Sequence, residues 1–184
     1  SVLLTDTSNS VTRFKELPWE PVVNRWYHIA FVKNGSNVSI YVDGQRLVNA
    51  NYLNTLQDGG SSNSPWDIGG NRAGNADYFN GYIDEVRIVA SAVYTDTFTP
   101  AHHQFFPTQE HVITSNDNYA NQVDLLLHFE EANGSNLTDS SSTDATVALD
   151  AGSLNSDNAR FGSKSLSVPV NGTGCQVNKL QQNE

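Results

Sequence analysis

The residues best suited to bind a ligand gather in one stretch, residues 66–78. Flat aromatic rings stack on sugar rings, and short polar side chains form hydrogen bonds with sugar hydroxyl groups. The stretch therefore predicts a glycan-binding loop. The alternative is ordinary turn chemistry with the tryptophan as a core residue. The candidate ligand-binding residues are Trp66, Asn71, Arg72, Asn75, Asp77 and Tyr78.

The other residues that could do chemistry show no catalytic or zinc-binding spacing. The five histidines match no zinc motif. No Gly-x-Ser-x-Gly nucleophile motif occurs. The acidic residues lie in predicted turns and at strand edges, where spacing identifies no acid/base pair of the kind that glycosidases use. We therefore predict that the chain is not an enzyme.

The composition is that of an acidic β protein rich in turns. The chain has 184 residues, a suitable length for one domain, and a formal net charge of −10. Such a chain repels nucleic-acid phosphates and anionic membrane surfaces, so we expect neither as a partner. No apolar run approaches the roughly 20 residues that a membrane-spanning helix needs. The one cysteine, Cys175, cannot form an internal disulfide.

The elements that position these residues are short strands. Residues 26–44 read as two strands joined by Asn34-Gly35-Ser36-Asn37, and Asn-Gly is a strong hairpin signal because both residues tolerate a positive φ. In residues 123–129, Leu125, Leu127 and Phe129 share one face. Residues 91–100 are compatible with one helical turn. Further strands are predicted at residues 2–4, 11–14, 66–69, 78–89 with a bulge at Asp84-Glu85, 147–149, 159–161 and 165–170.

Three stretches resemble laminin-G-like jelly-roll domains of the concanavalin-A type. WYHIAFVKNG at residues 26–35, followed by YVDG at 41–44, resembles the signature hairpin of that family. FNGYIDEVRI at 79–88 resembles its closing strand. LLLHFEEANGSNLTDS at 125–140 and FGSKSL at 161–166 resemble its opening strands. The resemblance implies an all-β fold, an antiparallel jelly-roll β-sandwich.

The three matches stand in an unusual order, because the opening strands come last. This order predicts the back half of one domain at residues 1–100, a linker at 101–121, and the front strands of a second, tandem domain at 122–184. The alternative is that residues 122–184 complete the first domain, as in a circular permutant. The family's central segment is not found in the chain. Neighbouring sequence, another copy or a different protein would have to supply those strands.

The resemblance also implies a calcium ion. In the resembled family an acidic residue near the closing strand often helps to bind calcium, and Asp84 stands at that place. Calcium takes six to eight oxygen ligands, which carboxylates and turn carbonyls supply. Glu130, in the opening strands, would contribute in a complete domain. The alternative is that Glu85, next to Asp84, pairs with Arg87 or faces water.

The version of the family that the chain resembles most closely occurs in virion proteins of tailed bacteriophages. It carries LLLHF near its start and YFNGYIDEVRI followed by TDTFTP near its end. This implies a structural or adhesion module of a tail fibre, tail appendage or capsid decoration, at the virion surface or outside the cell. Its partners would be other copies, other virion proteins and cell-surface glycans. The alternatives are a bacterial adhesin and a carbohydrate-binding accessory domain of a glycoside-active enzyme.

Overall fold

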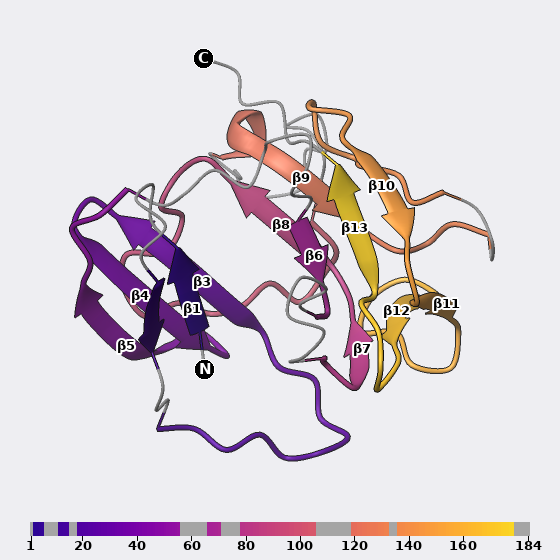
Figure 1. Ribbon diagram of the computed structural model, residues 1–184, viewed down its shortest axis with the longest axis horizontal. Coiled ribbons are helices and arrows are strands. Elements are labelled where there is room, and N and C mark those ends of the chain that lie inside the picture. The colour runs from indigo at the N-terminus through magenta and orange to yellow at the C-terminus, as the bar shows by residue number, and fades with distance from the viewer. Residues whose placement is uncertain are drawn as a thin grey trace. The chain divides into compact units, whose positions relative to one another are not determined.

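The computed structural model describes residues 2–5, 11–14, 18–55, 66–70, 78–105, 119–132 and 136–178 (Figure 1). Every strand pair in these ranges is antiparallel, and their one helical element is the short 3-10 helix η1 (Ala120–Gln122). The all-β prediction is confirmed. No helix in the described ranges is long and apolar enough to cross a membrane.

The chain folds into two compact units. The first consists of Ser1–Asp58 and Ser91–His102, and the second of Gly59–Ala90 and His103–Glu184. The first unit therefore takes two stretches of the predicted first domain, and the second unit takes the stretch between them together with the predicted front strands.

The first unit contains a two-stranded hairpin and a three-stranded sheet of order β3-β4-β5. The predicted hairpin is confirmed, but its turn is centred on Gly35 and Ser36, because pairing extends to Asn34 and Asn37. Asp43 and Gly44, both with positive φ, turn β4 into β5 as the hairpin rule requires. The strands are β1 (Val2–Thr5), β2 (Val11–Phe14), β3 (Ile29–Asn34), β4 (Asn37–Val42) and β5 (Gln45–Asn51).

Residues 91–100 pack on this hairpin through aromatic rings. The rings of Tyr94 and Phe98 stack at 3.6 Å, and Tyr41, which is fully buried, contacts both. The helical turn considered for this segment is absent. A helix would bond the Phe98 N–H to the Tyr94 carbonyl. Instead, the Phe98 N–H donates to the Gly44 carbonyl at 3.1 Å, and the Tyr94 carbonyl accepts from the Tyr41 hydroxyl at 3.3 Å.

The second unit contains the sheets β10-β13-β6, β11-β12-β7 and β8-β9. In each sheet one strand from residues 66–89 pairs with a strand that follows residue 122 (Figure 1). The strands are β6 (Trp66–Ile68), β7 (Gly81–Ile83), β8 (Val86–Val89), β9 (Val123–Leu127), β10 (Thr146–Leu149), β11 (Ser153–Asn155), β12 (Ser165–Val168) and β13 (Cys175–Asn178).

Two strand predictions for this unit are wrong. Residues 78–89 form two strands instead of one bulged strand, because Glu85 has a φ of 55° and the halves join different sheets, β7 with β12 and β8 with β9. Residues 159–161 form no strand, because the N–H groups of Arg160 and Phe161 donate to the Asp84 carboxylate. The sequence reading also missed β11 and β13, which are short and interrupted by polar residues.

The core of the second unit comes mainly from the strands after residue 122. The predicted apolar face of Leu125, Leu127 and Phe129 is confirmed, with each at most 1% exposed. Partly buried residues of β6, β7 and β8 pack against it, so that the two stretches of chain share one core. The buried cluster consists of Leu125, Leu127, Phe129, Leu137, Ala145, Val147, Leu154, Leu166, Val168, Cys175 and Val177.

Cys175 lies in this core as a free, fully buried thiol. Burial raises its pKa to about 12, so that almost no thiolate forms at neutral pH. We predict that a thiol reagent such as DTNB does not label the native chain and labels one thiol per chain in denaturant. Rapid labelling of the native protein would contradict the buried position of β13.

Candidate functional site

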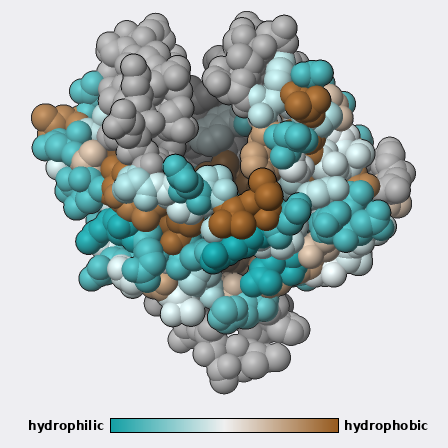
Figure 2. Space-filling view, turned by 90° about the horizontal axis from the view of Figure 1, so that it is seen from below, coloured by the Kyte–Doolittle hydropathy of each residue, from teal (hydrophilic) through white to brown (hydrophobic). Residues whose placement is uncertain are grey.

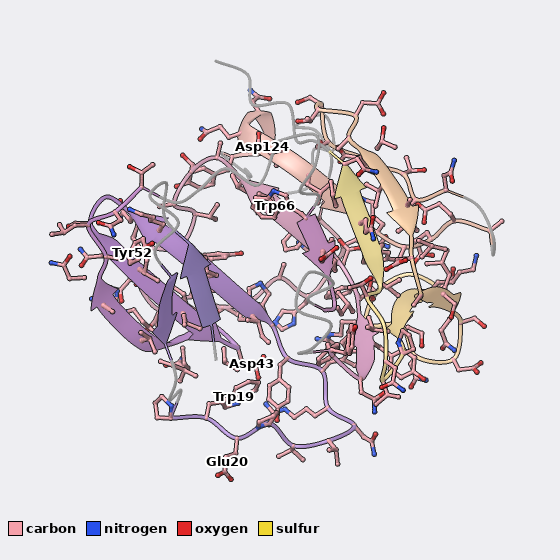
Figure 3. The ribbon with its side chains drawn as sticks, in the orientation of Figure 1. Trp19, Glu20, Asp43, Tyr52, Trp66 and Asp124 are labelled. Atoms are coloured by element: carbon pink, nitrogen blue, oxygen red, sulfur yellow. The ribbon has the colours of Figure 1, made fainter. Side chains whose placement is uncertain are left out.

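Trp66 begins β6, an edge strand of its sheet, opposite Val177 (Figure 3). Trp66 is 38% exposed and does not belong to the buried core. Trp66 is therefore partly open to solvent at the edge of the sheet. An exposed indole at a sheet edge offers a surface on which a sugar ring stacks.

The loop that follows Trp66 is closed at its base. The Phe79 N–H donates to the Gly69 carbonyl at 2.8 Å, which brings the two ends of the loop together. Tyr78 is half-buried beside Gly70, where an added Cβ would lie 2.8 Å from the tyrosine ring. Trp66 and Tyr78 thus flank one short loop. The remaining candidates, Asn71, Arg72, Asn75 and Asp77, lie outside the described residues, so the glycan site stays a prediction.

Asp84, one of the two predicted calcium ligands, holds a turn. Its Oδ2 accepts from the Arg160 N–H at 2.8 Å and from the Phe161 N–H at 2.9 Å. Burial raises the pKa of Asp84 to about 6; these two hydrogen bonds oppose the shift, and the charge of Glu85 adds to it. Its Oδ1 is buried and has no hydrogen-bond partner within the described ranges.

Glu130, the other predicted ligand, holds the end of the same turn. It accepts from the Ser163 N–H at 3.0 Å, the Ser163 hydroxyl at 2.6 Å and the Lys164 N–H at 3.2 Å. Burial opposes ionisation of Glu130, but these hydrogen bonds outweigh it and lower its pKa. Among the described residues, no group of three or more His, Cys, Asp or Glu is placed to hold a metal ion. The calcium site stays a prediction.

A part-buried contact between Glu85 and His128, which the sequence does not predict, lies between these two acids along the chain. Glu85 is 5% exposed, and its Oε1 lies 2.8 Å from His128 Nδ1. The other oxygen of Glu85 accepts from the Phe105 N–H at 2.9 Å. Glu85 therefore joins the β7–β8 break to the end of β9 and to the chain at residue 105. No sequence spacing signals this pair, since its members stand 43 residues apart.

The stability of the fold is expected to depend on the protonation of His128. The hydrogen bond to Glu85 raises its pKa above the ordinary 6.5; burial opposes this, and the nearby acidic charges support it. Because the pKa of His128 is higher in the folded chain than in the unfolded chain, protonated His128 stabilises the fold. This contribution is complete below pH 6.5 and is lost as the pH rises through the pKa of His128 in the folded chain. We predict that this part of the unfolding free energy decreases in denaturant titrations as the pH rises above 6.5, and that His128→Gln removes this pH dependence. A matching change in His102→Gln, an exposed position, would contradict this assignment.

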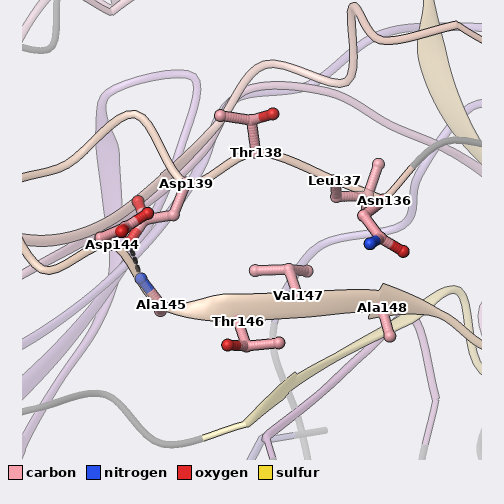
Figure 4. A pocket seen from close by; sticks show the side chains of 9 residues that line it. All are labelled: Asn136, Leu137, Thr138, Asp139, Asp144, Ala145, Thr146, Val147 and Ala148. Carbon is pink, nitrogen blue, oxygen red and sulfur yellow. Dashed lines mark hydrogen bonds between the residues drawn. The ribbon is translucent and has the colours of Figure 1, made fainter.

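The second unit also contains a hollow of about 330 Å³ between residues 136–139 and β10 (Figure 4). Leu137 and Val147 pair across it, and the Ala145 N–H donates to Asp139 at 2.8 Å. None of the lining residues is aromatic, so the hollow offers no stacking surface. Its lining is Asn136, Leu137, Thr138, Asp139, Asp144, Ala145, Thr146, Val147 and Ala148.

Comparison with known families agrees with this all-β architecture. Residues 5–98, more than half of the 184-residue chain, match the laminin G family model described as the concanavalin A-like lectin/glucanases superfamily. The chain belongs to this family, and the predicted fold class, an antiparallel β-sandwich of the concanavalin-A-like kind, is confirmed. No curated protein and no solved structure matches the chain.

The matched region bears on the candidate sites. It includes Trp66, the loop at 71–78 and Asp84, and it ends before Glu130. Laminin G-type domains are in general non-catalytic binding modules. A fold does not fix a function, however, so the ligand has to be argued from the site itself.

Proposed function

We propose that the protein is a non-enzymatic structural and adhesion module that binds glycans at the edge of β6. The observation that carries the proposal is the exposed indole of Trp66, 38% open to solvent, beside a loop closed by Phe79 and Gly69. Tyr78 stands at the far end of that loop. An aromatic surface next to short polar side chains is the chemistry that sugars need.

The proposal extends to the setting in which the module works. The likeness of its opening and closing strands to modules of tailed bacteriophages supports a role in a tail fibre, tail appendage or capsid decoration, at the virion surface. The acidic charge of −10 favours partners other than nucleic acid. Other copies of the chain and other virion proteins are then the protein partners, and cell-surface glycans the ligands.

The same proposal gives residues 122–184 a role in completing the first domain. The pairing of β6 with β13, β7 with β12 and β8 with β9 supports this arrangement, because each pair joins the two stretches of chain. The shared core supports it as well, since Ile68, Ile83, Val86 and Ile88 pack on residues that follow position 122.

Glycan binding is tested by screening bacterial surface polysaccharides and then comparing two matched variants. Trp66→Ala removes the proposed stacking surface and is expected to weaken binding about tenfold, which corresponds to about 1.4 kcal/mol. Tyr82→Ala is the control, because Tyr82 is an aromatic residue of β7 with a similar exposure of 37%. The proposal would be refuted if the protein binds no glycan, or if Trp66→Ala and Tyr82→Ala weaken glycan binding equally.

Calcium at Asp84 and Glu130 belongs to the same proposal. The buried Oδ1 of Asp84, without a hydrogen-bond partner in the described ranges, supports a cation there. Added calcium is expected to raise the melting temperature and a chelator to lower it, because an ion that binds only the folded chain stabilises it. A melting temperature that neither treatment changes means that there is no such site.

A further inference from the structure

Strand β3 has a free edge, since within the described ranges it pairs with β4 alone. The Asp43 N–H donates to the His28 carbonyl at 2.8 Å, which fixes the alternation of the antiparallel ladder. By this alternation, the backbone groups of residues 30, 32 and 34 face β4. The N–H and C=O groups of Ile29, Phe31 and Lys33 therefore point outward, where a further strand would bind.

The side chains along this edge are apolar and exposed. Ile29 is 62% and Phe31 39% exposed, although a monomer gains by burying both. Elsewhere too, apolar side chains reach the surface, and Figure 2 shows hydrophobic residues, in brown, among hydrophilic ones on one face of the molecule. The β3–β4 ladder runs over six residue pairs without a register shift. Lys33 is the one charged side chain on this edge. An edge whose exposed side chains are mainly apolar is the kind that pairs with another strand.

The opposite edge of the same sheet is protected. The pairing of β4 with β5 shifts register between Ile40 and Tyr41, which distorts the edge. The exposed residues of β5 are polar: Gln45, Arg46, Asn49 and Asn51. The contrast between the two edges of one sheet indicates that the β3 edge is open for a partner.

The distribution of charged residues around β3 favours a second copy of this acidic chain as the partner. Residues 21–42 contain no Asp or Glu, although the chain has 20 acidic residues and a net charge of −10. Two copies of the chain repel each other over most of their surface, whereas β3 itself carries no carboxylate. The adjoining acid, Asp43, is paired with Arg25 at 3.0 Å, and Lys33 is the one charged residue of the strand. Contact through β3 therefore brings two copies together with little local repulsion between carboxylates.

We propose that a second copy of this chain pairs with the β3 edge in antiparallel register about a two-fold axis near Phe31. The two sheets then join into one sheet across the dimer. Antiparallel pairing of identical strands is self-complementary and closes after two copies. It sets Lys33 of one copy opposite Ile29 of the other, so that the two lysines stay apart. The inference rests on the proposed role as an assembling module, but self-association and glycan binding are measured separately, and either can fail alone.

Hydrogen exchange of the unmodified protein tests the edge directly. The amides of Ile29, Phe31 and Lys33 are expected to exchange fast at low protein concentration. Near about 1 mM, where a weak dimer becomes populated, they are expected to exchange at least tenfold more slowly. The amides of Ala30 and Val32, bonded to β4, are expected to be protected at both concentrations. Outward amides whose exchange does not depend on concentration would overturn the proposal.

Two lysine variants give an independent readout by analytical ultracentrifugation. Phe31→Lys places like charges beside the two-fold axis and is expected to abolish the dimer. Val23→Lys adds the same charge at a residue that is 83% exposed and outside any strand, and is expected to leave the dimer intact. A wild-type chain that stays monomeric up to about 1 mM, or two variants that associate equally, would overturn the proposal.

Discussion

Gly44→Ala is expected to destabilise the first unit by roughly 3 kcal/mol or more, the upper range for a single substitution. Gly44 has a φ of 79°, and an added Cβ would lie 1.8 Å from the Phe98 carbonyl oxygen. The backbone around Phe98 would have to move, which breaks its hydrogen bond to the Gly44 carbonyl and separates the stacked rings from Tyr41. Denaturant unfolding followed by tyrosine and tryptophan fluorescence measures the loss.

The matched control for this variant is Gly35→Ala in the other turn of the same sheet. Gly35 also has a positive φ, 53°, but an added Cβ meets nothing within 4 Å. Only the backbone strain of about 1 kcal/mol is expected there. The difference between the two variants therefore isolates the docking of residues 91–100. Equal losses of stability would show that this docking contributes little.

Asp139→Ala is expected to cost the second unit about 3–5 kcal/mol, because the substitution removes the shared acceptor of several hydrogen bonds. Asp139 is 6% exposed. One oxygen accepts from the N–H groups of Leu126 and Ser141, and the other from the Ser141 hydroxyl and the Ala145 N–H. Alanine leaves three backbone donors of the β9 and β10 region without their acceptor, at about 1–3 kcal/mol for each buried group.

Two further variants make this prediction specific. Asp139→Asn keeps the size of the side chain and one acceptor oxygen, so an intermediate loss is expected, because its amide group meets a backbone donor. Asp157→Ala changes an exposed aspartate and is expected to stay within about 0.5 kcal/mol of wild type. A mild effect of Asp139→Ala would mean that water replaces the carboxylate and that the site is not tightly packed.

The features that were predicted correctly are those encoded by neighbouring residues. The turn at Gly35 and the turn at Asp43-Gly44 follow from local backbone preferences, and the apolar face of β9 follows from alternation. The sequence predicts a bulge at Asp84-Glu85 but not a full strand break, because the break depends on partner strands far along the chain, β12 for β7 and β9 for β8. The irregular segment at Phe98 was misread for the same reason, since its hydrogen-bond partner is Gly44.

At the candidate site, too, local features could be predicted from the sequence and long-range contacts could not. The aromatic and polar composition around Trp66 was sufficient to propose a glycan loop, and the exposure of the indole agrees with it. The carboxylates of Asp84 and Glu130 could not be assigned from sequence, because the groups that they contact, at residues 160–164, belong to a turn formed only in the fold. Asp139 carried one weak local signal, the Asp-x-Ser pattern typical of an Asx-type turn.

The central claim, that this family member binds glycans through Trp66, is tested most directly by NMR of the indole N–H signals. The chain has three tryptophans, so Trp19 and Trp26 serve as internal controls. Titration with an oligosaccharide identified by the polysaccharide screen is expected to shift the Trp66 signal in a saturable way and to leave the other two nearly unchanged. A bound oligosaccharide that leaves the Trp66 signal unmoved, or that shifts all three signals alike, would contradict the claim.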